Sequence, residues 1–212
     1  MKRIVTIAVI VVIVIVAATV LTMQRRPDLS KYEGLKRPRI VEMNDQRMLV
    51  VEVKGDPNVA GQKAFSLLLR TYYRMKATPK GAKAPAPRSR WPLSFTTPKS
   101  EWLGFYGMPV PDGVTTLPSY KAEPGLKMEL TTWEYGQVGE ILHVGPYDKE
   151  TPSVDNLMQF IKEQGYEVTG PHEEEYLKGP GMFFRGNPER YYTIIRYRVT
   201  KAGGLGAVDT TR

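Results

Sequence analysis

The chain has 212 residues, a formal net charge of +8 and no cysteine. This length fits one globular domain with a short accessory segment, and it allows a full hydrophobic core without disulfides or bound metal. The absence of cysteine excludes disulfides, thiolate metal ligands and a cysteine nucleophile.

The N-terminal segment, residues 4–23, reads IVTIAVIVVIVIVAATVLTM and carries no charged side chain. About 20 helical residues cross a hydrocarbon core about 30 Å thick. In lipid, a helix satisfies the backbone hydrogen bonds of such a segment. We therefore expect residues 1–26 to form an uncleaved, single transmembrane anchor. A cleaved signal peptide is the alternative, although its apolar region usually spans only about 7–15 residues.

The orientation of this anchor is ambiguous, because basic residues flank both of its ends. Lys2 and Arg3 precede the apolar segment, whereas Arg25 and Arg26 follow it. The positive-inside count favours a cytoplasmic domain, but long domains translocate largely regardless of charge. A short basic N-terminus before a signal-like helix favours export. We expect a single-pass membrane protein with its soluble domain on the outer or periplasmic side.

Three stretches lack a core-facing pattern. Residues 27–44 are polar and are expected to form a tether, and residues 76–90 (KATPKGAKAPAPRSR) to form an exposed basic loop. Residues 201–212 are expected to form a disordered tail. The folded domain then spans residues 45–200. No helix-turn-helix, zinc-finger or aromatic RNA-binding signature accompanies the basic loop, so no nucleic-acid partner is expected.

The folded part contains an internal repeat. MLVVEVKG at residues 48–55 and VGEILHVG at residues 138–145 are strand-like runs that end in glycine, ninety positions apart. A capping residue and a proline follow each run, Asp56-Pro57 and Thr151-Pro152. Such pairs suit the N-cap and the first position of a helix.

Each predicted helix carries one apolar stripe with the spacing i, i+3, i+4, i+7, which is typical of a helix that packs on a sheet. The stripe residues are Phe65, Leu68, Leu69 and Tyr72 in the first copy, and Val154, Leu157, Met158 and Ile161 in the second.

Strand-like runs follow each helix. They lie at residues 91–97 and 102–110 in the first copy, at 166–169, 174–177 and 191–199 in the second, and at 127–133 between the copies. The predicted fold class is α+β, a tandem β-α-β-β repeat with a mixed or antiparallel sheet and two helices, preceded by a single transmembrane helix. We expect a ligand groove at the junction of the two halves.

Several phrases resemble the GyrI-like small-molecule-binding family of the SOUL/effector-binding superfamily. They are ILHVGPY at 141–147, LMQFIKEQG at 157–165, PHEEEYLKGPG at 171–181 and NPERYYTIIRYRV at 187–199. KGDPNVAGQKAF at 54–65 and EWLGFYGMPVP at 101–111 resemble the branch that stands alone without a DNA-binding region. The resemblance implies a central pocket for lipophilic, often cationic or aromatic molecules, and a few relatives are hydrolases of reactive drug-like compounds.

The chain departs from that family at two positions. Many drug-sensing members carry a glutamate in the last strand, where this chain has Ile194, and relatives often have aspartate where this chain has Gly179. The first departure puts in doubt the recognition of a cation by a carboxylate at that position.

Glu174 precedes Tyr176 by two positions on a predicted strand, so their side chains share one face. A buried glutamate there can bind a cation or act as a general base. His143 aligns with Val53 in the repeat and is expected to face inward. It is a candidate ligand contact, general base or, since SOUL-type haem proteins share the architecture, haem ligand, with a structural histidine as the alternative. His172 is placed at the pocket mouth.

Aromatic side chains, which stack planar ligands and attract cations, complete the predicted site. The predicted ligand-binding residues are Trp102, Tyr106, Trp133, His143, Tyr147, Glu174 and Tyr176. Two histidines 29 positions apart, without acidic residues at ligand spacing, indicate no metal site, and no cofactor is expected.

Three functions fit the sequence. The first is a membrane-anchored protein that binds a small lipophilic or cationic molecule. The second is a hydrolase that uses Glu174 and Tyr176 to activate water. The third is a protein whose basic loop contacts anionic lipid. No constellation of nucleophile, base and orienting group is legible, so we expect binding rather than catalysis.

Overall fold

The computed structural model describes residues 28–77, 84–91, 98–180 and 186–203. The strands are β1 (Arg39–Met43), β2 (Gln46–Lys54), β3 (Arg88–Trp91), β4 (Leu103–Pro109), β5 (Lys127–Trp133), β6 (Gly136–Val144), β7 (Tyr166–Val168), β8 (His172–Lys178) and β9 (Tyr192–Lys201). The helices are α2 (Pro57–Tyr72) and α3 (Thr151–Glu163), with 3-10 segments η1 (Ser30–Lys36), η2 (Lys99–Glu101), η3 (Tyr147–Lys149) and η4 (Pro188–Arg190). All the strands lie in the compact unit that begins at Tyr32.

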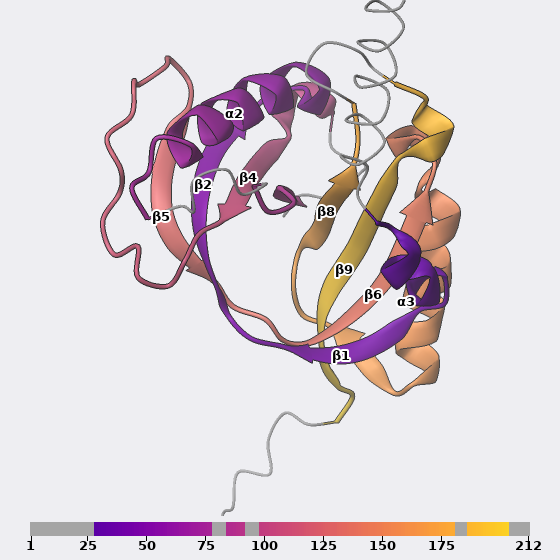
Figure 1. Ribbon diagram of the computed structural model, residues 1–212. Helices are drawn as coiled ribbons and strands as arrows, with labels where there is room; N and C mark the ends of the chain where they lie inside the picture. Colours follow the sequence, from indigo (N-terminus) through magenta and orange to yellow (C-terminus); the bar gives the residue numbers. More distant parts are fainter. Residues whose placement is uncertain (1–27, 78–83, 92–97, 181–185, 204–212) are drawn as a thin grey trace, which may run out of the picture. The chain divides into compact units, whose positions relative to one another are not determined.

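The strands form one nine-stranded sheet in the order β1-β6-β9-β8-β3-β4-β2-β5, and β7 pairs with β9 off this path. The second half of the chain supplies β6-β9-β8 and the first half supplies β3-β4-β2, so the halves meet where β8 pairs with β3 (Figure 1). This seam runs from the Arg88–Glu175 pair to the Trp91–His172 pair.

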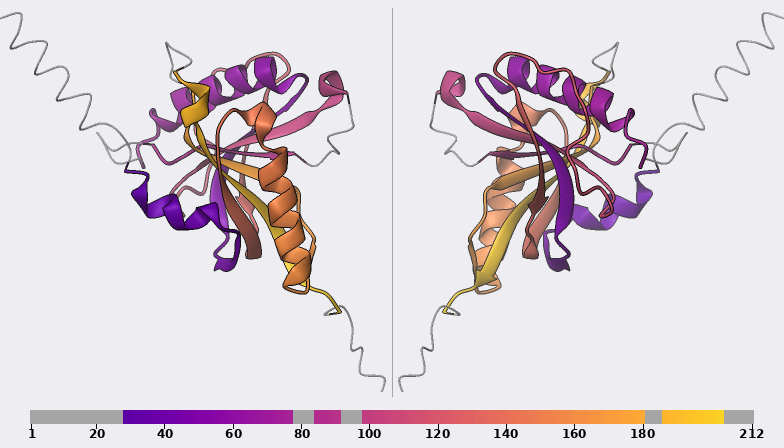
Figure 2. Two further views of the ribbon diagram at one scale, coloured as in Figure 1. Left: turned by 90° about the vertical axis from the view of Figure 1, so that its right-hand side faces the viewer. Right: turned by 90° about the vertical axis from the view of Figure 1, so that its left-hand side faces the viewer.

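The two helices cover one face of the sheet. Helix α2 packs on β2 and β4, whereas α3 packs on β6, β7 and β9, and the helices run in different directions (Figure 2). Asp56 starts α2, because its carboxylate accepts the Asn58 backbone N–H at 2.9 Å and Pro57 needs no donor. Buried leucines of α2, Leu67 and Leu68, each contribute about 1.5–3 kcal/mol by leaving water.

Helix α3 lies close to its strands because Gly139 leaves room for it. A Cβ atom at this position would lie 2.8 Å from the side chain of Ile161, which is too close for any real contact. Leu157 and Ile161 pack there against Ile141 and Ile195 in the second hydrophobic cluster. Gly139 therefore fixes the distance between helix α3 and the sheet.

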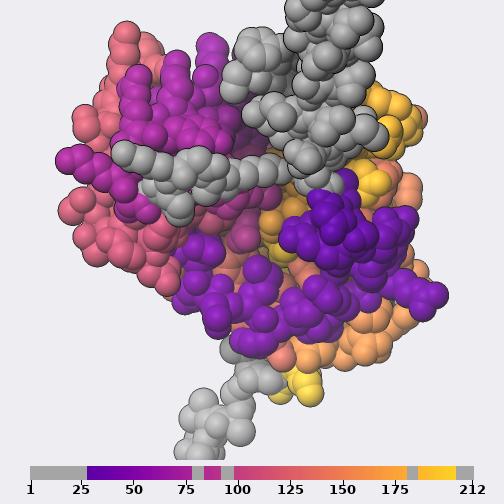
Figure 3. Space-filling view, in the orientation of Figure 1, coloured from indigo at the N-terminus to yellow at the C-terminus, as the bar shows by residue number. Residues whose placement is uncertain are grey.

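The opposite face of the sheet is also covered. Leu35 of η1 packs against Leu142 and Ile194, and β1 closes the sheet edge beside β6. The indigo atoms of β1 lie directly beside the orange atoms of the second half in the space-filling view (Figure 3). Residues 39–43, within the stretch expected to be a tether, thus belong to the sheet.

A buried ionic network lies on this second face. Arg196 bonds Glu140 through Nε at 2.8 Å and also bonds Glu175, and its guanidinium lies 3.7 Å from Glu173. Arg90 donates from Nε to Glu173 at 2.8 Å, and Arg88 lies 3.4 Å from Glu175. We define Glu140, Glu173, Glu175, Arg88, Arg90 and Arg196 as the ionic network. Arg88 and Arg90, which belong to the loop predicted to contact lipid, are therefore part of strand β3 and form ion pairs with glutamates.

The predicted fold class requires two corrections. Every strand pair among the described residues is antiparallel rather than mixed. The reason is that β4 inserts between β2 and β3, and β9 between β6 and β8. Strands joined by a helical crossover, which would pair in parallel, are therefore never neighbours.

The second correction concerns the membrane. Helices α2 and α3 have 16 and 13 residues and polar outer faces, whereas a membrane span needs about 20 apolar residues. Along the described part of the chain, no helix is both long and apolar enough to cross a bilayer. The predicted span at residues 4–23 lies outside the described residues. The expected single-pass membrane localisation, with an outer or periplasmic domain, is therefore not supported.

The ionic network supplies a stability prediction. We expect Arg196→Met to lower the free energy of unfolding by about 3–5 kcal/mol, because it leaves buried glutamates without compensation. Arg39 pairs with the same Glu140 but is 55% exposed, so Arg39→Met is the matched control and costs about 0–1 kcal/mol. Urea denaturation of both variants checks this, and equal losses would contradict the assigned roles.

Candidate functional site

One row of side chains crosses the seam on the helix-covered face of the sheet. Tyr106 of β4 lies opposite Ser89 of β3, Ser89 lies opposite Glu174 of β8, and Glu174 lies opposite Ile195 of β9. All four are buried. The seam therefore places a carboxylate from the second half beside aromatic and hydroxyl groups from the first half.

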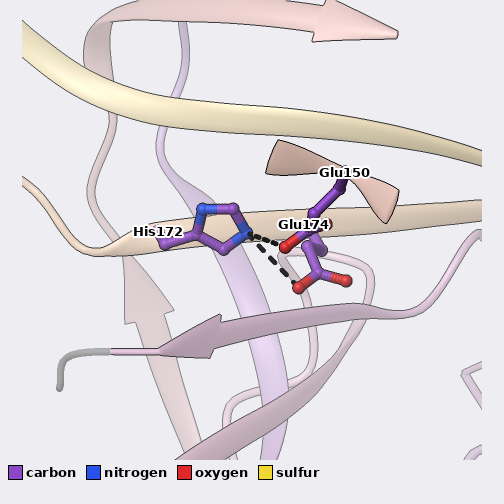
Figure 4. A group of neighbouring side chains, drawn as sticks. All are labelled: Glu150, His172 and Glu174. Atoms are coloured by element: carbon purple, nitrogen blue, oxygen red, sulfur yellow. Dashed lines mark ion pairs between the residues drawn. The ribbon is translucent and has the colours of Figure 1, made fainter. Parts of the chain in front are cut away.

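Glu150, His172 and Glu174 converge beside this row, and we call them the Glu–His–Glu cluster. His172 Nε2 lies 3.3 Å from Oε1 of Glu174 and 3.8 Å from Oε1 of Glu150, as the dashed lines of Figure 4 show. The other ring nitrogen, Nδ1, lies 2.7 Å from the hydroxyl of Tyr197. The side chains of His172, Glu174 and Glu150 are 3%, 9% and 15% exposed, so the cluster is shielded from water.

The cluster combines a strand pattern with the start of a helix. His172 and Glu174 alternate with Glu173 and Glu175 along β8, so the first pair faces the helices and the second pair faces the ionic network. Glu150 occupies the N-cap position of α3, one residue before the expected Thr151, but its side chain makes no capping hydrogen bond. The carboxylate of Glu150 turns instead toward His172 (Figure 4).

Burial perturbs the acids of this cluster. Desolvation, followed by the charge of Glu174, raises the pKa of Glu150 to about 9. Oε2 of Glu150 is buried and has no hydrogen-bond partner among the described residues. Glu174 accepts a hydrogen bond from Nε1 of Trp91 at 3.0 Å. At neutral pH, Glu150 therefore retains a proton, because two adjacent buried carboxylates resist joint ionisation.

Aromatic rings pack around the cluster. We define the aromatic wall as Phe65, Tyr106, Tyr147, Tyr176 and Tyr191. The centroid distances are 5.0 Å for Phe65–Tyr106, 5.6 Å for Phe65–Tyr176, 5.5 Å for Tyr147–Tyr176 and 5.3 Å for Tyr147–Tyr191. The rings are in mutual contact, so the expected groove is occupied by the protein's own side chains. A guest molecule must displace at least one ring.

The charge of Glu174 reaches several tyrosines of the wall. Burial and then the Glu174 charge raise the pKa of Tyr106, Tyr147 and Tyr176. The Tyr176 hydroxyl lies 2.6 Å from Oγ of Ser89. These phenols therefore stay neutral at physiological pH and act as hydrogen-bonding groups around the carboxylate.

The structure brings together four of the seven predicted ligand-binding residues, namely Tyr106, Tyr147, Glu174 and Tyr176. The other three lie elsewhere. Trp102 packs beside Trp91 at the margin of the first core, with a centroid distance of 5.6 Å. Trp133 lies on the opposite face, with the guanidinium of Arg90 4.1 Å from its ring.

His143 faces inward, as expected, but both its ring nitrogens are engaged. Nδ1 lies 3.0 Å from Oγ of Ser153, and Nε2 lies 3.0 Å from the carbonyl oxygen of Pro146. These bonds tie strand β6 to the turn that leads into α3. The geometry therefore gives His143 a structural role in holding the segment that carries Tyr147 and Glu150.

Sequence reasoning missed Glu150, Trp91 and Tyr197, and it placed His172 at the mouth of the site instead of at its centre. His172 had a usable signal, since it lies two positions before Glu174 on a strand. Glu150 had none, because only the fold brings the start of α3 next to β8.

The two departures from the family pattern have structural reasons. The hydroxyl of Tyr147 lies 2.5 Å from where a Cβ atom of residue 179 would be, so any larger residue at position 179 would displace the end of the Tyr147 side chain. Ile194 lies opposite Glu175 and packs with Leu35, on the face away from the cluster. The carboxylate of this site therefore comes from Glu174.

The ionic network borders a cavity of about 190 Å³, lined in part by Arg90, Glu173, Arg196 and Arg198. Each of these four charged groups already has an ion-pair partner. We therefore regard the Glu–His–Glu cluster as the stronger candidate site.

Comparisons with known proteins support the fold. A crystal structure of a hydrolase from Listeria innocua has a TM-score of 0.61 and 23% identity, and the match covers 82% of this chain and 100% of that chain. The C-terminal domain of EcmrR has a TM-score of 0.55 and 18% identity, covering 78% of this chain and 98% of that chain. The chain matches no family model and no curated protein sequence. At these identities, the likenesses bear on the fold alone.

The raised pKa of Glu150 makes stability depend on pH. Its folded pKa of about 9 exceeds its reference value of 4.5, so the folded chain binds more protons in this window and loses stability as pH rises through it. We expect Glu150→Gln to flatten that slope in thermal melts recorded with a chelator present. Glu163→Gln, an exposed change on the same helix, should leave the slope unchanged. Identical slopes for the wild type and Glu150→Gln would refute this assignment.

Proposed function

We propose that the chain binds a small lipophilic or aromatic molecule, cationic where it meets Glu174, between α2 and α3. The observation that carries this proposal is a buried carboxylate surrounded by aromatic rings. A buried carboxylate is costly unless it is paired, and aromatic faces attract cations. A cationic aromatic ligand would satisfy both conditions. The resemblance to GyrI-like domains supports this class of ligand, and the structural likenesses support the fold on which it rests.

Binding in this site requires movement of the aromatic wall. Tyr147 belongs to the short segment η3, whereas Tyr106 and Tyr176 are held on central strands of the sheet. The Tyr176 hydroxyl is further fixed by Ser89 at 2.6 Å. Tyr147 is therefore the ring that swings aside when a ligand enters, and the cost of that step lowers the affinity for small or weakly stacking molecules.

The role of Glu174 in binding can be tested with tetraphenylphosphonium, a lipophilic aromatic cation, and triphenylphosphine oxide, its neutral counterpart. We expect Glu174→Gln to weaken binding of the cation by tenfold or more, about 1.4 kcal/mol or more, and to leave the neutral probe nearly unaffected. Isothermal titration calorimetry measures both affinities.

The matched control is Glu175→Gln, the same chemical change one position along β8 on the opposite face of the sheet. It should not alter the affinity for either probe, and thermal melts confirm that each variant is folded. Equal affinity of the wild type and Glu174→Gln for the cation, or failure of the wild type to bind either probe, would count against the proposal.

A hydrolase is the second candidate, because two carboxylates and a histidine adjoin one another. In this reaction, Glu174 removes a proton from water, the resulting hydroxide attacks an electrophilic carbon, and protonated Glu150 donates its proton to the leaving oxygen. The Tyr176 hydroxyl would orient the substrate. The Listeria innocua structure is called a hydrolase in its title, which is consistent with this reading.

Aryl esters and aryl epoxides provide a direct test of hydrolysis. We expect Glu174→Gln to reduce kcat by about 10²–10⁴-fold while binding of the neutral triphenylphosphine oxide persists. Product formation is followed by chromatography, with Glu163→Gln as the control. A wild-type rate no higher than that of Glu174→Gln would eliminate this second candidate and leave the binding proposal intact.

A further inference from the structure

We propose that Glu150, His172 and Glu174 bind one divalent transition-metal ion of the Zn²⁺ class. One ligand atom from each residue lies within 4.8 Å of the other two. The proposal is separate from the proposed binding of a cationic molecule, because a metal ion bound by Glu174 would take the carboxylate that such a ligand needs. All three side chains point toward a common centre in Figure 4.

The distances within the cluster match a metal site. Ligand atoms about 2.1 Å from a tetrahedral zinc ion lie about 3.4 Å from one another. The separations from His172 Nε2 are 3.3 Å to Glu174 and 3.8 Å to Glu150. An ion can therefore enter between these atoms with only small movements of the carboxylates.

Hydrogen bonds around the cluster favour a metal as well. A metal-bound histidine usually donates its other ring N–H, which fixes the ring and its tautomer. The Nδ1 atom of His172 lies 2.7 Å from the Tyr197 hydroxyl. When Nδ1–H donates there, the lone pair of Nε2 points at the side-chain oxygen atoms of Glu150 and Glu174, so three possible ligand atoms converge. A cation at their centre would be bound by all three.

The two carboxylates of the cluster are also positioned for a metal ion. Glu174 is oriented by the indole N–H of Trp91 at 3.0 Å, as carboxylate ligands commonly are by outer partners. The buried Oε2 atom of Glu150 has no hydrogen-bond partner among the described residues. Glu150 also occupies an N-cap position without capping the helix. Its side chain is thus held toward the cluster with hydrogen-bonding capacity to spare.

The donor set narrows the metal class. One imidazole and two carboxylates suit Zn²⁺, Co²⁺, Fe²⁺ or Mn²⁺, whereas Ca²⁺ prefers six to eight oxygen ligands. Three protein ligands leave a position open, which is typical of catalytic rather than structural zinc. Tyr147 and Tyr176 lie nearby in the aromatic wall, so a neutral or anionic ligand that displaces Tyr147 could reach the open position.

A single proton shared within the cluster is the alternative to a metal ion, and metal titration distinguishes these two cases. The full-length chain is stripped with a chelator, dialysed and titrated with Co²⁺, whose visible absorption reports coordination by protein ligands, and with Zn²⁺ by calorimetry. We expect about one ion per chain. His172→Gln and Glu150→Gln should each weaken binding by more than tenfold, and Tyr197→Phe, which removes no ligand, by about tenfold.

Glu163→Gln is the matched control, because it makes the same change as Glu150→Gln at an exposed position of helix α3, and it should leave metal affinity unchanged. Circular dichroism of the metal-free variants verifies folding, and Tyr197→Phe keeps the test valid where His172→Gln does not fold. No cobalt absorption with the wild type, or equal affinity of the wild type and Glu150→Gln, would overturn the proposal and leave the proton as the occupant.

Discussion

The organisation of this domain depends on how strand β8 keeps four consecutive ionisable residues, His172 to Glu175, largely out of water. Their side chains are at most 13% exposed, so each of them needs partners within the protein. On one face, arginines neutralise Glu173 and Glu175. On the other face, the described groups beside Glu174 are a histidine, an indole N–H, tyrosine hydroxyls and a second carboxylate. The first arrangement stabilises the fold. In the second arrangement, the charge of Glu174 can be neutralised by a bound ligand.

The sequence predicted the elements whose signals are local. Both helices begin within one residue of the predicted start, because the proline after each repeated strand marks the first turn. The strands of the repeat were recognised from their apolar runs. The sequence did not reveal that residues 39–43 complete the sheet edge, since a strand of only five residues, none of them fully buried, gives a weak signal within a polar stretch. Nor could it show that β4 and β9 separate the crossover strands, which made the sheet antiparallel.

The candidate site was predictable only in part, for the same reason. Glu174 and Tyr176 share a face by alternation, so their pairing followed from the strand. Trp133 obeys the same alternation, but its face is the one that the ionic network occupies, which no local pattern indicates. Glu150 joins His172 through tertiary structure alone. The spacing of the two histidines, from which no metal site was predicted, therefore could not reveal the cluster, since two of its three members are glutamates.

The seam between β3 and β8 also has a consequence for the integrity of the site. The two halves of the chain contribute unlike chemistry to the centre: the first supplies Trp91, Ser89 and Tyr106, and the second supplies Glu150, His172 and Glu174. Neither half alone would assemble this constellation. Local unfolding at the β3–β8 pairing would therefore disperse these side chains, even where each helix stays packed on the strands of its own half.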